Sequence, residues 1–435
     1  MNKQLNIVVF RNNLRVQDNE ALYNALKEKE NIICIYSLEI LKGRNYDFKK
    51  CGDFRKRFIY QSILEIKEKL ESKNISLYCV NSINETLTNL SKDWNLKIFY
   101  EKEVGVEEHY FETILEEFAC ESYLNQTLIE AFEFDITKSF SNFRNRVEKS
   151  IKNKNIIIKE PLEVFIEKRE KKLEVLLKNQ ELKLPDVKMF LEGGEEKAKQ
   201  RVDFYFSNFL HDYFNTRSLV DGVDNSSKIS PYLACGCISA RTVYKILKEY
   251  EQKSYESKSS YWIFFELLWR DFFHLILMQS SNKLFLNTGL LENIKYDFKR
   301  DRDKMKIFFE AKTKIDIIDA GIIQLKTTGW ISNRLRQLIA SYFVKNLGFD
   351  FRYGAAFFEE YLMDYNVASN YGNWAYQAGV ANDKKYRVFD PIKQSSIYGG
   401  KEYVKKYLGK EESKPIFDYA KMALEVKENI FKIKD

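Results

Sequence analysis

Cysteine is scarce in this sequence, with six residues among 435. The six are scattered, and only Cys235 and Cys237 lie close together. No second pair and no nearby histidine completes a set of metal ligands. The pattern excludes a disulfide-stabilised secreted scaffold and favours buried thiols in a reducing compartment. We therefore expect a cytoplasmic protein without a metal site.

Long hydrophobic runs are missing as well. The first apolar run, residues 7–10, is too short for the core of a signal peptide. The most apolar stretch, residues 261–278, carries four ionisable side chains that would be costly to bury in lipid, namely Glu266, Arg270, Asp271 and His274. We therefore expect no secretory signal, no transmembrane helix and no membrane partner.

The two commonest phosphate-binding loops are also absent. Neither G-x-G-x-x-G nor G-x-x-x-x-G-K-S/T occurs, which argues against dehydrogenases and P-loop enzymes. No set of nucleophile, base and acid is visible, so any chemistry must come from a bound cofactor. The net charge of +7 permits nucleic-acid binding, but a solvated basic surface explains it equally well.

What is present begins with a regular alternation of elements in the first 130 residues. Short apolar runs lie at residues 6–10, 31–36, 75–80 and 97–100, and amphipathic helical patterns at 19–27 and 54–70. Such alternation is typical of a parallel sheet wound by helices on both faces. The sequence therefore predicts an α/β domain over residues 1–130.

The composition changes after this domain. Residues 131–199 are dense in Lys and Glu and contain Pro161, Pro185 and the pair Gly193–Gly194, which indicates a charged connector with some helix, lying on the surface without forming a core. Residues 200–435 are predicted to be almost entirely helical, with long amphipathic stretches at 239–251, 260–279, 331–346 and 354–363. The expected fold class is α/β followed by a larger all-α domain.

A polar loop precedes one predicted helix start. Ser226, Ser227, Lys228 and Ser230 come just before Pro231, a residue favoured in the first turn of a helix. Three hydroxyls and an amine beside free N–H groups could hold a diphosphate. An ordinary capped helix with a polar approach loop is the alternative.

Three further groups of polar residues fall at helical spacing. Glu266, Trp269 and Arg270 lie at i, i+3 and i+4, so they could stack on a base and bind its edge, or form one ion pair at a domain seam. Two arginines in the first turns of the helix that carries Asn333, Arg334, Arg336 and Gln337 oppose its dipole, which suggests that they face an anion. A spacing of four predicts one ligand-lining face for Asn366, Asn370 and Trp374.

These segments resemble the photolyase/cryptochrome family. Its successive sequence blocks are matched in order by residues 10–22, 230–234, 266–271, 330–336 and 370–374. Within the family, the sequence is similar to that of the cryptochrome DASH branch at residues 265–273, 332–337, 379–383, 393–394 and 402–405. Tyr376 and Gln337 occupy positions where bacterial cyclobutane photolyases usually carry Trp and Met, which also favours the DASH branch.

The resemblance implies a bound FAD in a U shape, fully reduced in the active state, which splits cyclobutane pyrimidine dimers under blue or near-ultraviolet light. The implied FAD contacts are Tyr213 and Ser226, Ser227, Lys228, Ile229 and Ser230 at the phosphates and ribityl chain, and Arg270, Asn333, Arg336, Asp364, Asn366 and Asn370 around the flavin. Arg336 would pair with Asp364, and Asn370 would lie beside flavin N5. Asn366 replaces an Asp that is usual in this stretch.

The resemblance also implies a lesion pocket and an antenna. The pocket would be lined by Glu266, Trp269, Asn333, Arg334, Gln337 and Tyr376, with Glu266, which also borders the cofactor, accepting a hydrogen bond from the flipped dimer and Trp269 stacking on it. Glu108 matches the position that binds methenyltetrahydrofolate. The (6-4) photolyases are disfavoured because none of the three histidines lies near Asn333 and Gln337.

The implied activity is that of a deoxyribodipyrimidine photolyase, a carbon–carbon lyase, acting as a monomer on DNA that carries pyrimidine dimers, with a preference for single strands. The alternative is a blue-light photoreceptor that binds FAD and DNA without repair. A flavoprotein that binds nucleic acid generally is a third, minor possibility.

Tryptophan is rare in this aromatic chain, with five residues beside 33 Phe and 27 Tyr. Family members usually reduce their flavin through three tryptophans. Trp374 matches the one nearest the flavin, but Phe351 stands at the middle position, and no Trp lies between Trp269 and Trp330 for the outer one. We therefore expect slow photoreduction, or a route through tyrosines such as Tyr342, Tyr353 or Tyr371.

Overall fold

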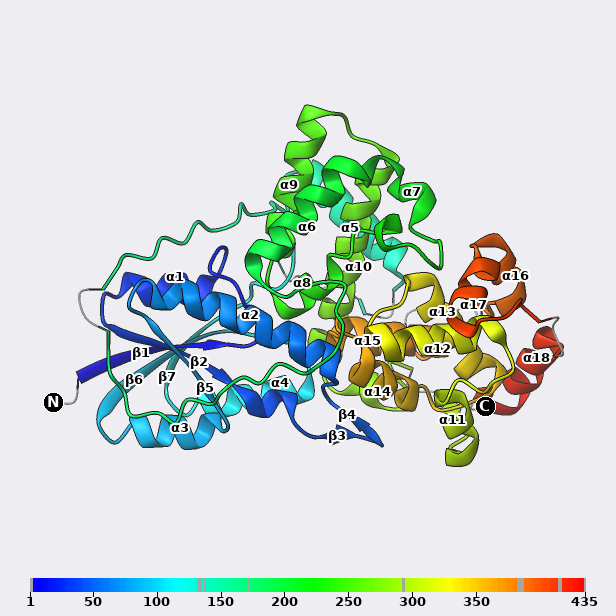
Figure 1. Cartoon of the computed structure of the whole chain (residues 1–435), viewed down its shortest axis with the longest axis horizontal. Helices are drawn as coiled ribbons and strands as arrows, with labels where there is room; N and C mark the ends of the chain where they lie inside the picture. The colour runs from blue at the N-terminus through cyan, green and yellow to red at the C-terminus, as the bar shows by residue number, and fades with distance from the viewer. Residues whose placement is uncertain are drawn as a thin grey trace.

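A computed structural model describes residues 3–130, 135–136, 138–169, 172–291, 294–381, 387–413 and 417–433. It confirms the predicted fold class, with an N-terminal α/β part followed by a C-terminal helical part (Figure 1). Two of the residues quoted for the resemblance to the DASH branch, Asn382 and Asp383, lie outside the described residues. Within the described part of the chain, no helix combines the length and apolar character needed to cross a membrane.

The N-terminal part contains one five-stranded parallel sheet in the order β5-β2-β1-β6-β7. Its strands are β1 (Lys3–Phe10), β2 (Asn31–Ser37), β5 (Ser76–Val80), β6 (Trp94–Glu101) and β7 (Ala119–Tyr123). Four of them match the predicted apolar runs. The edge strand β7 was not predicted, because its sequence ACESY has no continuous apolar run.

Helices cover both faces of this sheet, namely α1 (Glu20–Lys27), α2 (Asp53–Glu71), α3 (Ile83–Leu90) and α4 (Val106–Leu115). On β1, Val8 and Phe10 pack in the same buried cluster as α1 and α2, whereas Ile7 and Val9 pack with α3 and α4. This division follows from the alternation of side chains along a strand. The short strands β3 (Arg44–Asn45) and β4 (Phe48–Lys49) form a separate antiparallel pair.

The predicted connector contains a helix, α5 (Phe140–Lys152). From there to Glu195, where the next helix begins, its described residues form no helix or strand and run along the α/β part (Figure 1). Its backbone donates from Arg169 to Lys73 at 3.0 Å and from Gln180 to Cys79 at 2.8 Å. The prediction that this segment forms no core was wrong for α5. Phe140, Phe143 and Val147 are buried, because their spacing gives the charged helix one apolar stripe.

The helices that frame the candidate site are α7 (Tyr213–Thr216), α8 (Ser230–Cys235), α9 (Ala240–Lys253), α10 (Lys258–Ser280), α13 (Asn333–Ser341) and α15 (Val367–Ala378), and α14 (Phe351–Tyr361) packs against α15. The predicted helix 331–346 is α13 followed by a π-helical turn, Tyr342–Asn346. The other α-helices and strands of the described residues are α6 (Glu195–Asn208), α11 (Arg302–Phe309), α12 (Asp316–Thr328), α16 (Pro391–Ile397), α17 (Gly400–Leu408), α18 (Tyr419–Ile430) and the antiparallel pair β8 (Ile294–Tyr296) and β9 (Phe431–Ile433).

Buried ionic contacts join the two parts. The Arg241 guanidinium on α9 lies 2.7 Å from the Asp18 carboxylate, and both side chains are buried. Arg15 donates to the Gly236 carbonyl oxygen at 3.1 Å. A Cβ on Gly236 would lie 1.9 Å from the Asn12 backbone oxygen, so only glycine allows this close approach. The α/β part therefore packs directly on the start of the helical part.

Candidate functional site

The helical part holds a cavity of about 270 Å³ that gathers most of the predicted cofactor residues. Its polar lining consists of Tyr213, Arg217, Ser226, Ser227, Lys228, Ser230, Glu266, Arg270, Asn333, Arg336, Asp364, Asn366 and Ser369. Apolar side chains complete it, namely Ile229, Leu233, Ala234, Val243, Ile263, Leu267, Trp330 and Ile331. Four of these residues are basic and two are acidic, so the cavity favours an anionic ligand.

The loop before α8 forms one wall of this cavity. Arg201 holds the loop by donating to the Ser227 carbonyl oxygen at 2.8 Å and pairing with Asp224 at 2.8 Å. The Lys228 amine donates to Ser226 Oγ at 2.8 Å and lies 3.9 Å from the centre of the Trp330 ring. Burial lowers the pKa of Lys228 to about 7. A buried amine among hydroxyls is a site where a phosphate would restore the charged form.

Asp364 and Arg336 meet beside Ser230, at the end of this loop. Asp364 Oδ2 accepts from Ser230 Oγ at 2.6 Å and from the Arg336 guanidinium at 2.9 Å. Asp364 Oδ1 is buried and has no hydrogen-bond partner among the described residues. An unpaired carboxylate oxygen in a cavity calls for an N–H group from a ligand. The N–H of a flavin ring system meets that requirement, so the residues present fit FAD.

Helix α10 contributes one acidic and one basic side chain to the cavity, Glu266 and Arg270. Glu266 pairs with Arg217, with 2.6 Å between Oε1 and Nη1. Burial raises the pKa of Glu266, and Arg217 opposes the shift. One turn later, the Arg270 guanidinium donates to the Gln126 carbonyl oxygen, and burial lowers its pKa. Glu266 is therefore held by an ion pair with Arg217, whereas Arg270 is held by a backbone carbonyl oxygen.

Trp269 does not line the cavity, although it shares the predicted helical face. Residues i+3 and i+4 are about 100° apart around a helix, so Trp269 and Arg270 diverge. The Trp269 ring stacks on Phe140 of α5, with centroids 3.7 Å apart and planes 10° apart. The ring of Tyr376 meets it edge-on at 5.7 Å. Trp269 and Tyr376, both predicted to line the lesion pocket, thus contact each other, and neither lines the cavity.

The predicted residues of α13 separate in the structure. Asn333 is exposed and lines the cavity, and Arg336 reaches Asp364. The Arg334 guanidinium lies 4.4 Å from the centre of the Tyr398 ring, and Gln337 is half-buried; neither lines the cavity. Arg336 therefore faces a carboxylate, as the sequence suggested, whereas Arg334 faces an aromatic ring, which the sequence did not suggest.

Along α15, only the first of the three evenly spaced residues lines the cavity. Asn366 caps the helix by accepting from the Ser369 N–H at 3.0 Å. Asn370 is buried and donates to the Ala355 carbonyl oxygen at 2.9 Å. Trp374 is buried among aromatic rings, and its Nε1 has no partner among the described residues. The predicted row of ligand-lining groups therefore ends after one turn.

Glu108 lies apart from the cavity, in the first turn of α4 and near the start of α15. A Cβ on Gly105 would lie 2.2 Å from Glu108 Oε2 and 3.4 Å from Val367 Cγ1, which places the carboxylate between the two parts of the molecule. Burial and the nearby Glu103 raise the pKa of Glu108 to about 8. This carboxyl group therefore holds its proton near neutral pH and can donate a hydrogen bond.

Two functional residues were missed by the sequence analysis. Arg217 lines the cavity and pairs with Glu266, and Arg201 holds the loop before α8. Arg217 lies four residues after Tyr213, so the helical spacing could have placed both on one face. Nothing in the sequence linked Arg201 to a loop 26 residues away.

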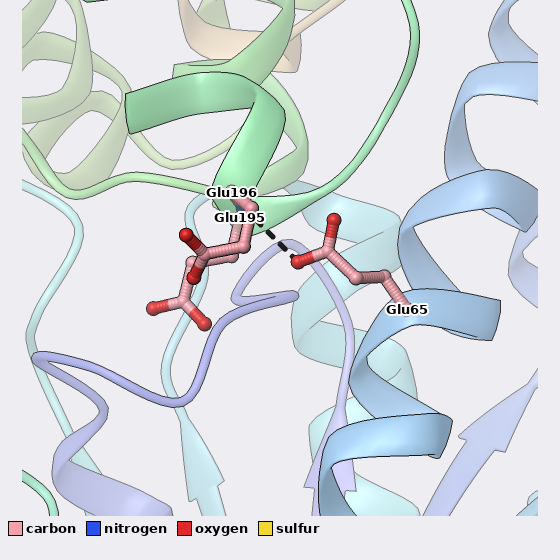
Figure 2. Close-up of side chains that lie close together, drawn as sticks. All are labelled: Glu65, Glu195 and Glu196. Carbon is pink, nitrogen blue, oxygen red and sulfur yellow. Dashed lines mark hydrogen bonds between the residues drawn. The ribbon is translucent and has the colours of Figure 1, made fainter. Parts of the chain in front are cut away.

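An acidic cluster outside the cavity has a simpler explanation. Glu65 on α2 and Glu195 and Glu196 at the start of α6 bring carboxylate oxygens within 4.8 Å of one another (Figure 2). Lys69 Nζ lies 3.1, 3.0 and 2.8 Å from oxygens of these three residues, respectively. Glu195 also accepts the backbone N–H groups of Val16 and Gln17. The cluster therefore joins α2, α6 and the Val16–Gln17 segment.

Comparisons with known proteins agree with this geometry. Residues 6–165 match the DNA photolyase family, and residues 262–429 match the FAD binding domain of DNA photolyase. The cryptochrome DASH of Synechocystis is 35% identical over 417 residues, covering 90% of this chain and 84% of the relative. That of Idiomarina loihiensis is 34% identical over 436 residues, covering 95% and 94%.

Solved structures show the same fold. The Synechocystis cryptochrome superposes with a TM-score of 0.89 at 30% identity, covering 98% of this chain and 99% of that one. A bacterial class III photolyase from Agrobacterium tumefaciens shares the fold alone, with a TM-score of 0.83 at 22% identity and 98% coverage of each chain. The chain therefore belongs to the photolyase/cryptochrome family, with cryptochrome DASH proteins as relatives over nearly its whole length.

Proposed function

We propose that this protein uses light to repair cyclobutane pyrimidine dimers in DNA, with reduced FAD in the cavity of the helical part. The observation that carries the proposal is the cavity itself. It brings Lys228, Arg336 and the serine hydroxyls together with an unpaired oxygen of Asp364, next to Glu266 and Asn333. These groups match a diphosphate, a flavin edge and a pyrimidine edge.

The residues of the cavity would hold the cofactor by charge and hydrogen bonding. The hydroxyls of Ser226, Ser227 and Ser230 and the amine of Lys228 would hold the phosphates, and Asp364 would accept an N–H of the flavin ring. Arg336 would stabilise negative charge on that ring by Coulomb attraction in a site that largely excludes water. When bound and reduced, FAD would supply the light-driven electron that opens the cyclobutane ring.

The lesion would be held at the mouth of the same cavity. Glu266 and Asn333 would bind the polar edge of a flipped dimer, with Trp269 and Tyr376 beside them. Flipping a dimer from a duplex costs a few kcal/mol and less from a single strand, and stacking recovers about 1–3 kcal/mol per base. This difference supports a preference for single-stranded DNA.

An antenna completes the proposal. Glu108 lies between the α/β part and α15, and its raised pKa lets its carboxyl group donate a hydrogen bond near pH 7. We infer that it holds the pterin of methenyltetrahydrofolate. Absorbance of the purified protein tests this inference, because Glu108→Ala should remove the folate band and leave the flavin band.

A blue-light photoreceptor without repair is the second candidate. The stacking of Phe140 on Trp269 favours it, because one face of the expected lesion platform is already covered. Flavin photochemistry in a protein that releases or recruits a partner on illumination, with no loss of dimers, would support this function. A monomer in the cytoplasm is expected for either function.

The test is light-driven repair by the reduced protein. FAD-loaded protein is illuminated with dimer-bearing oligonucleotides, single- or double-stranded, and intact thymines are measured. Repair in the light but not in the dark, faster on single strands, is expected. Glu266→Gln should reduce the rate about tenfold or more, by loss of a charge-assisted hydrogen bond, whereas exposed Glu249→Gln should not. Absence of repair by protein that binds both FAD and DNA would contradict the proposal.

A further inference from the structure

One face of α10 continues from Glu266 towards the start of the helix, outside the cavity. Lys258, Trp262 and Glu266 follow one another at a spacing of four, which places them on one side of the helix. Trp262 is half-buried and Lys258 is exposed, and neither lines the cavity. The cofactor and lesion sites described above use neither of these two residues.

The Arg217 guanidinium joins this face of α10 to the cavity. It lies 3.7 Å from the centre of the Trp262 ring and pairs with Glu266 Oε1 at 2.6 Å. The first contact has the geometry of a cation–π interaction. Because Arg217 and Glu266 both line the cavity, the Trp262 ring lies at its edge.

Phe214 of α7 presents an exposed ring beside Trp262. It lies three residues before Arg217, so the two are neighbours on the same helical turn. The centroids of the Phe214 and Trp262 rings are 6.1 Å apart, and the Phe214 side chain is 42% exposed. An exposed ring next to a binding cavity offers a planar ligand a surface on which to stack.

Basic groups border these rings. The Lys258 amine lies 5.6 Å from the centre of the Phe214 ring, and the Arg334 guanidinium lies 4.4 Å from that of Tyr398. Neither cation forms an ion pair with a carboxylate of the described residues. Burial lowers the pKa of Arg334, and the nearby charge of Arg217 lowers it further. The rim of the cavity therefore carries positive charge that an anion would stabilise.

Aromatic rings and cations in this arrangement are typical of surfaces that bind single-stranded nucleic acid. Bases stack on the rings, and the cations attract the phosphates. We propose that Phe214, with Trp262 beside it, stacks the nucleotide that flanks the lesion in single-stranded DNA, and that Lys258 binds a phosphate of the same strand. The proposed function supplies the identity of this strand, and the inference rests on it to that extent.

Binding of undamaged DNA tests the stacking contact without any repair. Fluorescence anisotropy of a labelled oligothymidine of about ten nucleotides gives its dissociation constant from the FAD-loaded protein. Phe214→Ala should weaken binding about tenfold, because one base loses its stacking partner, whereas Phe214→Trp should preserve the affinity. Phe165→Ala removes an exposed ring of the connector and is the matched control, which should bind normally.

The salt dependence of the same binding tests the phosphate contact. Each phosphate neutralised on a single strand contributes about −0.7 to the slope of log affinity against log salt concentration. Lys258→Gln should therefore make the slope shallower by about 0.7. Lys73→Gln, at an exposed position beyond the end of α2, is the control and should leave the slope unchanged.

Two further ligands separate this surface from the lesion site. A thymine-dimer dinucleotide has no flanking base, and a blunt duplex has no unstacked one, so Phe214→Ala should weaken the oligothymidine more than either. Equal losses on all three ligands, an affinity for oligothymidine that Phe214→Ala leaves unchanged, or no binding of oligothymidine at about 0.1 mM would each overturn the proposal. Binding that depends on Phe214 in a protein that repairs nothing supports this contact and contradicts only the proposed function.

Discussion

Burial favours the neutral form of the Lys228 amine, whereas a bound phosphate would favour the charged form. In the cofactor-free protein, burial lowers the pKa of this amine to about 7, so the amine is neutral above that pH. A bound diphosphate favours the charged form, and binding above pH 7 therefore takes up a proton. The affinity for FAD should fall as the pH rises above 7, by up to about tenfold per unit.

The measurement is the dissociation constant of FAD from pH 6 to 9, by flavin fluorescence. Lys228→Arg keeps its charge throughout this range and should flatten the dependence. An affinity of the unmodified protein that does not change with pH would contradict the role given to Lys228.

Arg217 controls the ionisation of Glu266. It supplies both interactions that lower the pKa of this carboxyl group, against a burial that raises it. In Arg217→Met, the pKa of Glu266 should therefore rise further, by about one unit or more. The pH profile of dimer repair should shift upward, and Arg217→Lys should restore part of the shift. An unchanged midpoint in Arg217→Met would show that the ion pair has no part in the reaction.

For single residues, the sequence motifs predicted most of the side chains that line the cavity. They did not predict which of these side chains pair with one another. Ser230, Arg336 and Asp364 were placed in one site, and the structure brings them into hydrogen-bond contact. Arg217 was missed because its partner Glu266 lies 49 residues away. A single motif indicates which residues face a site, whereas ion pairs between segments distant in sequence depend on the tertiary fold.

Among the elements, α5 links the connector to the helix that carries Glu266 and Arg270. Phe140 is buried against Trp269, so Phe140→Ala leaves a cavity and should lower the free energy of unfolding by about 3–5 kcal/mol. Thermal melting measures the loss. Phe165→Ala, at a position that is 78% exposed, is the control and should change it by less than about 0.5 kcal/mol. Equal melting temperatures for the two variants would contradict the packing role of α5.

Helices and strands with a strong hydrophobic periodicity could be predicted from the sequence, whereas those with a weak periodicity could not. Four strands and the long helices α2, α9 and α10 follow from apolar runs and amphipathic spacing. The edge strand β7 was missed because Glu121 and Ser122 break its apolar pattern. The core contribution of α5 was missed because its Lys and Arg residues dominate the composition.

Over the whole molecule, the described structure offers no continuous tryptophan path from Trp374. Its aromatic neighbours are Phe343 and Phe358, with centroids 5.9 and 5.0 Å away. Phe351, at the middle position of the family's route, is fully buried. We expect slow photoreduction, or a route through Tyr342, Tyr353 or Tyr371.

Transient absorption of oxidised protein with an external thiol reductant measures this process. Replacing one of these tyrosines by Phe should slow photoreduction further. Rapid photoreduction that only Trp374→Phe abolishes, with every Tyr replaceable, would exclude the tyrosine route.

The role that we propose for the cavity of the helical part is DNA repair. It is tested most directly by illuminating reduced, FAD-loaded protein with a dimer-bearing single strand and counting the restored thymines. Repair that requires light, and that Glu266→Gln strongly reduces, is expected. Protein that binds FAD and the damaged strand, yet restores no thymines under any illumination, would contradict it.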